Sequence, residues 1–102
     1  MRRSLLVGLL LGGLAPQAAL AADVAKGKDL AESLCARCHA VGPSGASPEA
    51  KAPPFRTLKT LYPVESLAES LAEGIVTGHD KMPEIQMEPE AIRDFIAYLK
   101  TL

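Results

Sequence analysis

One short motif restricts the possible folds of this chain more than any other feature: Cys35-Ala36-Arg37-Cys38-His39. Two thiols separated by two residues and followed by a histidine form the attachment pattern for a c-type haem. If Cys35 and Cys38 lie on one helical turn, their sulfurs reach two vinyl groups of the porphyrin together, and His39 is placed to ligate the iron. The motif therefore predicts one covalently bound haem and its first axial ligand.

The other interpretations of this cysteine pair explain less of the motif. A thioredoxin-like pair is expected at a helix N-terminus that follows a strand, whereas residues 24–34 before Cys35 are predicted to be helical. A structural zinc site needs four ligands. The chain has two Cys and two His, and Cys38 and His39 are adjacent, which is awkward for one tetrahedral ion. A structural disulfide would leave His39 without a role.

The N-terminal stretch is typical of a secretory signal peptide. Basic Arg2 and Arg3 precede an apolar run over residues 4–14, and Ala19-Leu20-Ala21 fits the cleavage pattern. The apolar run is shorter than the ~20 residues of a membrane span. We therefore predict a cleaved signal peptide at residues 1–21, a periplasmic or otherwise exported protein and no stable membrane span after cleavage. An uncleaved anchor is the alternative.

The mature domain is then residues 22–102. A domain of this size has a small apolar core and needs additional stabilisation, such as a bound haem. Residues 1–21 hold two of the 11 basic residues and none of the 12 acidic ones, so the mature domain carries a formal charge of −3. This charge argues against nucleic-acid binding, which needs a basic patch.

Apolar periodicity and capping residues predict three helices, at residues 23–36, 63–73 and 89–99. Asp23 is a plausible N-cap for the first, Gly74 a C-cap for the second, and Pro89 the first residue of the third. Gly27 is costly inside a helix and indicates a close crossing by the last helix. We expect Phe95 and Tyr98 to pack near Gly27 and residues 30–31. Residues 40–60 and 75–88 are predicted to be loops.

The two loops contain candidate residues for completing a haem site. A metal-bound histidine usually donates its second ring N–H to an acceptor, and the carbonyl of Pro53 or Pro54 is a candidate for His39; alternatively, these prolines only stiffen the loop. Met82 offers a soft sulfur ligand, and the following proline holds it in extended backbone. Met87 and His79 are its competitors for the sixth position.

The acidic residues of the second helix recur every four positions. The repeat is either a docking face for a basic partner or simply a solvated surface. Its members are Glu65, Glu69 and Glu73.

Several segments resemble those of a small class I cytochrome c, in that family's order. They are Gly27, the Cys35–His39 motif, Pro-Pro-Phe at 53–55, Gly-His-x-x-Met-Pro at 78–83 and Ile-Ala-Tyr-Leu at 96–99.

The resemblance implies an all-α cytochrome c fold in which small helices surround one haem and the N- and C-terminal helices cross. It also implies thioether bonds at Cys35 and Cys38, with His39 and Met82 as axial ligands. The chain lacks the Trp that this family often places near a haem propionate. Arg56 and Tyr62 are the candidates to replace that residue.

The function that these features favour is a soluble one-electron carrier, because His/Met ligation leaves no open position at the iron. One alternative is a cytochrome subunit that relays electrons from a periplasmic dehydrogenase complex. A haem peroxidase or ligand sensor ranks third, since it needs an open iron position or a labile Met82. We expect redox proteins as partners and favour a monomer.

Overall fold

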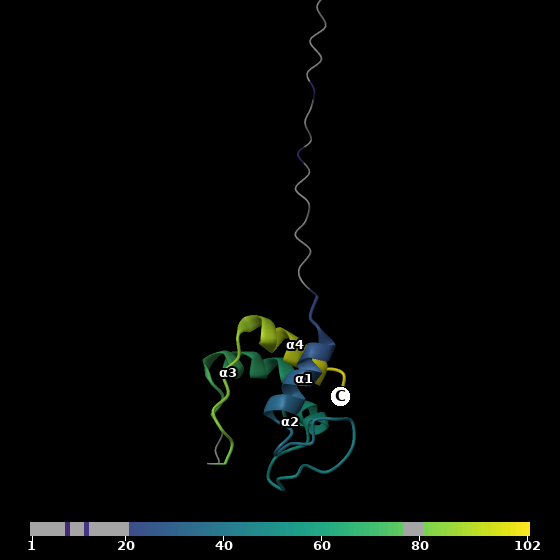
Figure 1. Ribbon diagram of the computed structural model, residues 1–102, viewed down its shortest axis with the longest axis vertical. Coiled ribbons are helices and arrows are strands. Elements are labelled where there is room, and N and C mark those ends of the chain that lie inside the picture. The colour runs from purple at the N-terminus through teal and green to yellow at the C-terminus, as the bar shows by residue number, and fades with distance from the viewer. Residues whose placement is uncertain (1–7, 9–11, 13–20, 77–80) are drawn as a thin grey trace, which may run out of the picture.

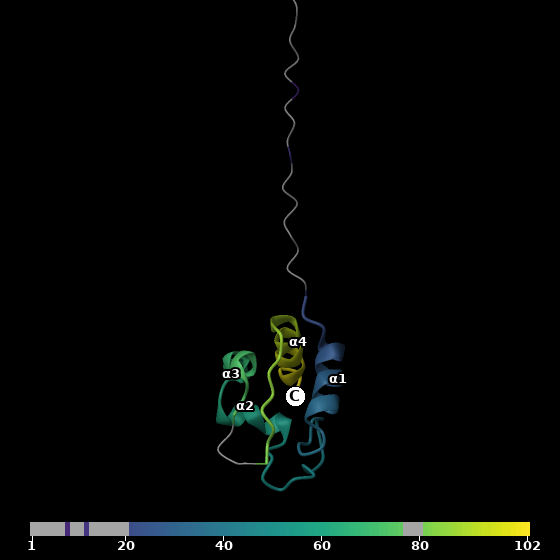
Figure 2. The same ribbon diagram turned by 60° about the vertical axis from the view of Figure 1, so that its left-hand side comes forward.

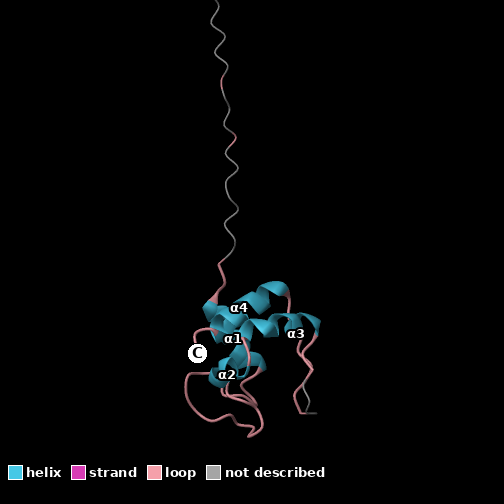
Figure 3. Cartoon of the chain, turned by 180° about the vertical axis from the view of Figure 1, so that it is seen from behind, coloured by secondary structure: helices cyan, strands magenta, loops and turns pink. Residues whose placement is uncertain are grey.

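The computed structural model describes residues 8, 12, 21–76 and 81–102. Its α-helices are α1 (Val24–Leu34), α2 (Leu58–Leu61), α3 (Leu67–Glu73) and α4 (Pro89–Leu99), and two 3₁₀ turns, η1 (Phe55–Thr57) and η2 (Val64–Ser66), precede α2 and α3. The described residues form helices and loops with no strand, apart from an isolated bridge between Ile75 and Ile85 (Figure 3). The predicted all-α class is confirmed. None of the described helices is long and apolar enough to cross a membrane.

Helices α1 and α4 pack against each other, and they lie side by side in both views (Figures 1 and 2). Gly27 is buried at this contact. A Cβ atom at Gly27 would overlap the carbonyl oxygen of Asp94 and lie 2.8 Å from the Cβ of Tyr98. The predicted crossing at Gly27 is confirmed, because the two backbones approach more closely than a side chain allows.

The apolar face of α4 faces the core. Pro89 occupies the first helical position, as expected. The core also receives side chains from α1, from both 3₁₀ turns, from α2 and α3, and from the segment before α4. The buried apolar residues of α4 are Ile92, Phe95, Ile96, Tyr98 and Leu99.

One carboxylate of α4 is also buried. Asp94 is 6% exposed, and its Oδ1 accepts a hydrogen bond of 2.7 Å from the backbone N–H of Asp23. The Asp23 side chain in turn accepts from the N–H of Lys26 at 3.1 Å, which makes it the predicted N-cap of α1. The two carboxylates therefore satisfy N–H groups at the start of α1, where negative charge is also favoured by the helix dipole.

We expect Asp94→Ala to lower the free energy of unfolding by about 1.5–3 kcal/mol, the usual contribution of a hydrogen bond to a charged group. Urea denaturation of the haem-loaded protein measures the change. Asp29→Ala, which removes an exposed carboxylate from α1, is the matched control and should leave the midpoint nearly unchanged. Equal midpoints for Asp94→Ala and the wild type would contradict the assignment.

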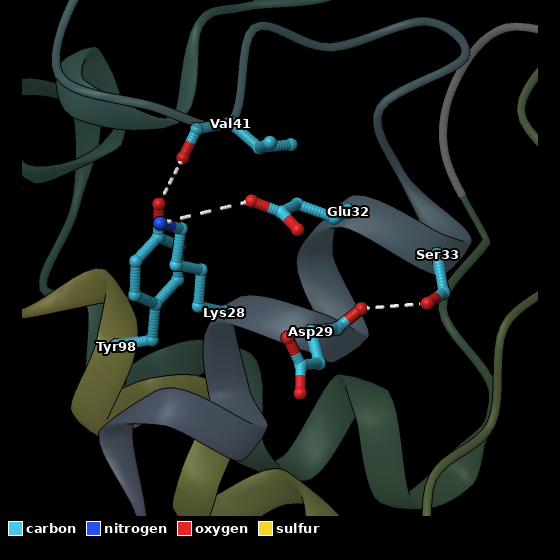
Figure 4. Close-up of polar contacts among 6 residues, drawn as sticks. All are labelled: Lys28, Asp29, Glu32, Ser33, Val41 and Tyr98. Carbon is cyan, nitrogen blue, oxygen red and sulfur yellow. Dashed lines mark hydrogen bonds and ion pairs between the residues drawn. The ribbon is translucent and has the colours of Figure 1, made fainter.

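Tyr98 connects α4 to the loop that follows the haem motif. Its hydroxyl donates to the carbonyl of Val41 at 2.6 Å, two residues beyond His39 (Figure 4). Burial, together with the charge of Glu32, raises the pKa of Tyr98, so the phenol remains a donor at physiological pH. Figure 4 also shows two exposed contacts within α1: the ion pair Lys28–Glu32 (3.9 Å) and the hydrogen bond from Ser33 Oγ to the Asp29 carbonyl (2.7 Å).

The boundaries of two predicted helices need correction. The first helix ends at Leu34 rather than at residue 36, because the chain turns at Cys35. The predicted helix 63–73 begins with the 3₁₀ turn η2, in which the N–H of Ser66 donates to the Pro63 carbonyl, and becomes α-helical only at Leu67. Such tight turns are common at helix starts. The predicted end at Gly74 is confirmed, with φ of +101°.

The prediction that residues 40–60 are entirely loop is wrong for its last part. The turn η1 and helix α2 occupy residues 55–61. Phe55 and Leu58, three residues apart, are both buried and give this short helical segment an apolar side. The glycines and prolines that indicate a loop extend only as far as Pro54, because residues 55–62 contain neither residue type.

The acidic repeat does not form one uninterrupted helical stripe. Glu65 lies in η2, whereas Glu69 and Glu73 lie in α3. Lys100 Nζ lies 2.9 Å from Glu65 Oε1, and its hydrogen bond lowers the pKa of Glu65. One of the three charges is therefore already paired within the chain.

Candidate haem site

The haem motif forms one tight turn directly after α1. The N–H of Cys35 donates to the Ala31 carbonyl at 3.0 Å. The Cys35 carbonyl then accepts from the N–H groups of Cys38 at 3.1 Å and His39 at 2.9 Å. These bonds place both thiols and the imidazole on a single turn, which is the arrangement expected for attachment at two neighbouring vinyl groups. Both cysteines are free thiols.

The environment of the thiols does not suit a thiol–disulfide exchange site. Burial raises the pKa of the Cys35 thiol to about 11, whereas a reactive exchange cysteine needs a lowered pKa. The described residues also contain no group of three or more His, Cys, Asp or Glu side chains that could hold a metal ion. The zinc interpretation therefore gains no support from the described part of the chain.

The ring of His39 is held by a hydrogen bond and by an aromatic contact. With its proton on Nδ1, His39 donates to the carbonyl of Pro53 at 2.8 Å. Its ring centroid lies 5.0 Å from that of Phe55, which packs edge-on against Phe95 at 5.9 Å. This tautomer leaves the lone pair on Nε2 available for a metal.

The two prolines have different partners. The Pro54 carbonyl accepts from both the N–H and the hydroxyl of Thr57, at 2.9 and 2.7 Å, and so starts η1. The N–H of Phe55 donates to the Ala40 carbonyl at 2.9 Å, which ties this segment to the residue after the motif. Of the two candidate acceptors, Pro53 is therefore the one that bonds His39.

The motif opens onto two adjoining hollows. The inner cavity, of about 180 Å³, is lined by apolar and aromatic side chains from η1, α2, α3, α4 and the segment before α4. The outer cleft, of about 550 Å³, includes charged side chains at its edge. The residues common to both hollows are Cys35, His39, Met82 and Ile85.

The two methionine candidates differ in their surroundings. Met82 is half-buried and lines both hollows. Met87 is 7% exposed and belongs to the apolar core, and its N–H donates to the Leu71 carbonyl at 2.9 Å. Met87 thus packs in the core, although it also lines the inner cavity. His79 lies outside the described residues.

The two candidate replacements for tryptophan also differ. Tyr62 lines the inner cavity, and burial raises its pKa. Arg56 lines neither hollow; its Nη1 donates to the Gly45 carbonyl at 2.7 Å and closes the loop after the motif. The structure therefore brings Tyr62, but not Arg56, to the lining of the candidate site.

Sequence reasoning did not assign several of the lining residues to the site. The apolar faces of the helices signal that their residues are buried, but not that they surround a cofactor. The charged cleft residues Glu49 and Lys81 carry no such signal, because they are 32 positions apart. The unassigned residues of the inner cavity are Leu58, Leu67, Leu71, Ile75, Ile85 and Phe95.

The lining fits a c-type haem. An apolar hollow suits the porphyrin ring, two free thiols and an oriented imidazole stand at its edge, and a thioether lines the same space. Fold and site together define a small all-α haem protein.

Comparison with known proteins agrees with this class. Residues 24–102 match the Cytochrome c family, to which the chain belongs. The chain is 36% identical over 84 residues to cytochrome c-552 of Bradyrhizobium diazoefficiens. The matched region covers 82% of this chain and 79% of that relative. A search of solved structures finds no match. The family membership identifies the cofactor as one covalently bound haem c with its iron, and the chemistry as electron transfer.

Proposed function

We propose that the protein is a soluble one-electron carrier whose haem iron is ligated by His39 and Met82. The observation that carries this proposal is that His39, oriented by Pro53, and Met82 line the same apolar hollow. When bound, the haem supplies a ferric/ferrous couple, and a Met/His ligand pair favours a raised potential.

Each part of the chain has a separate task in this proposal. Cys35 and Cys38 hold the porphyrin covalently, and the Pro53 carbonyl keeps the His39 ring in one orientation and makes it a stronger donor. The apolar lining would keep water from the iron, and Tyr62, which lines the same cavity, is the proposed partner of a propionate. If His39 and Met82 both ligate the iron, no position would remain there for a substrate.

The proposal includes export. Near the start of the described domain, the backbone N–H of Asp23 donates to Asp94. Removal of residues 1–21 would leave Ala22 as a single residue before that anchor. A domain that begins this close to the predicted cleavage site is compatible with a periplasmic or otherwise exported protein, in which the haem would be attached after transport.

We expect protein isolated from the native host to begin at Ala22 or Asp23 and to carry one haem that acid acetone does not extract. Intact mass spectrometry measures both properties in one spectrum. The double variant Cys35→Ala/Cys38→Ala is the control and should lose the covalent haem. A wild-type mass equal to that of the chain without haem would contradict the attachment sites. A mass that still includes residues 1–21 would contradict the export proposal.

A free carrier and a subunit of a dehydrogenase complex differ in whether they are bound to another protein. Isolation under mild conditions, followed by size-exclusion chromatography, distinguishes the two: a free carrier elutes as the monomer alone. Co-elution with a larger flavin- or quinone-containing protein would favour the subunit instead.

A further inference from the structure

An ion pair joins two segments that meet at the outer cleft. Lys81 Nζ lies 3.9 Å from Glu49 Oε2, and both residues line that cleft. Lys81 directly precedes Met82 in the chain. The N–H of Glu49 donates to the Cys38 carbonyl at 3.1 Å. The pair therefore connects the segment that carries Met82 to the turn that carries the haem attachment.

We propose that the Lys81–Glu49 ion pair is a positioning contact that keeps Met82 in the sixth ligand position and makes its displacement by outside ligands harder. This inference rests on Met82 being that ligand. Neither Lys81 nor Glu49 needs to touch the iron or the porphyrin, because the effect is transmitted through the backbone of the neighbouring residue.

The backbone on the C-terminal side of Met82 is already held by hydrogen bonds. The N–H of Ile75 donates to the Ile85 carbonyl, and the N–H of Met87 donates to the Leu71 carbonyl, each at 2.9 Å. On the N-terminal side, the adjacent described residue is Lys81, and its ammonium group is held by Glu49. The pair thus supplies an attachment on the side of Met82 that these backbone bonds do not reach.

Glu49 is well suited to be the fixed end of this contact. Its N–H is bonded to Cys38, and its own carbonyl accepts from the N–H of Ala52 at 3.0 Å. The Glu49 side chain is 34% exposed, whereas that of Lys81 is 65% exposed. Most of the ordering cost therefore falls on Lys81. Exposed ion pairs of this kind contribute little stability. Here the contribution would change the equilibrium between bound and displaced Met82 by about two- to fivefold.

An outside ligand can reach the iron only in the fraction of molecules in which Met82 has left it, so its apparent affinity reports that fraction. Imidazole, titrated into the ferric haem-loaded protein at a pH where it is neutral, is a suitable probe. Its binding is followed spectroscopically. We expect Lys81→Ala and Glu49→Gln each to raise the apparent affinity about two- to fivefold.

The control for charge removal is Lys59→Ala, since Lys59 lies on α2, donates to the Leu102 carbonyl and lines neither hollow. It should leave the imidazole affinity unchanged. The charge-swapped double variant Lys81→Glu/Glu49→Lys should return towards the wild-type affinity, whereas each single swap should not. Added salt should raise the affinity of the wild type but not that of Lys81→Ala, because it screens the pair.

Two results would overturn the inference: a Lys81→Ala affinity equal to that of the wild type, or single swaps whose effects simply add in the double variant. Its failure is distinguishable from failure of the proposed ligation. If the wild-type protein lacks the methionine-to-iron charge-transfer band, Met82 ligation has failed. If the band is present and the variants behave like the wild type, only the positioning role has failed.

Discussion

Gly27→Ala should be among the most destabilising single substitutions in this domain, lowering the free energy of unfolding by about 2–3 kcal/mol. A Cβ atom at Gly27 would overlap the Asp94 carbonyl oxygen and lie 2.6 Å from the carbonyl carbon. The obstacle is backbone in the middle of α4, so no rotamer change relieves it. Helix α4 must move away from α1, and the core that it carries must repack.

Denaturant midpoints of the haem-loaded proteins measure this effect. For a domain of this size, the loss corresponds to a fall in Tm of roughly 10–20 °C. Gly42→Ala is the matched control, because no atom lies within 4 Å of a Cβ built there. If Gly27→Ala and Gly42→Ala unfolded at the same denaturant concentration, the close helix crossing would be refuted.

Met82→Ala should abolish the methionine-to-iron charge-transfer band and lower the reduction potential. Removing the thioether opens the sixth position or admits a weaker ligand, and axial ligands set haem potentials over a range of ~0.8 V. We expect a fall on the order of 0.1 V or more. The open position should also let the reduced variant bind carbon monoxide, which the wild type should resist.

The companion variants Met87→Ala and His79→Ala separate the candidate ligands. Met87→Ala should keep the band but unfold more easily, by about 2–4 kcal/mol, because Met87 is buried in the core. His79→Ala should change neither property. Loss of the band in Met87→Ala, with retention in Met82→Ala, would transfer the ligand assignment to Met87 and leave the family unchanged.

The features that could be predicted from the sequence are those with a local signal. The haem motif needs five consecutive residues, and its turn is closed by hydrogen bonds between Cys35 and the residues three and four positions later. Asp23 and Pro89 mark helix starts through capping and backbone geometry that act within one turn. Gly27 indicates a crossing because a glycine in a helix has an energetic cost that close packing explains.

Local signals also account for the wrong boundaries. Proline and glycine predict the loop after residue 40 correctly up to Pro54, but two apolar residues three apart are too short a pattern to reveal η1 and α2. A proline at position 63 is compatible with either a 3₁₀ or an α-helical first turn. In the structure this turn is 3₁₀, and its Val64 is buried in the core.

The sequence by itself determined the turn of the haem motif and the identity of the crossing helices, because short-range chemistry specifies both. It also predicts haem attachment at Cys35 and Cys38, with His39 as a ligand. Only the tertiary structure decided that Pro53 rather than Pro54 accepts from His39, that Asp94 is buried against Asp23, and that Lys81 reaches Glu49. The Asp94–Asp23 and Lys81–Glu49 contacts join residues 71 and 32 positions apart. Such pairings follow from how the helices dock around one core, which no local pattern records.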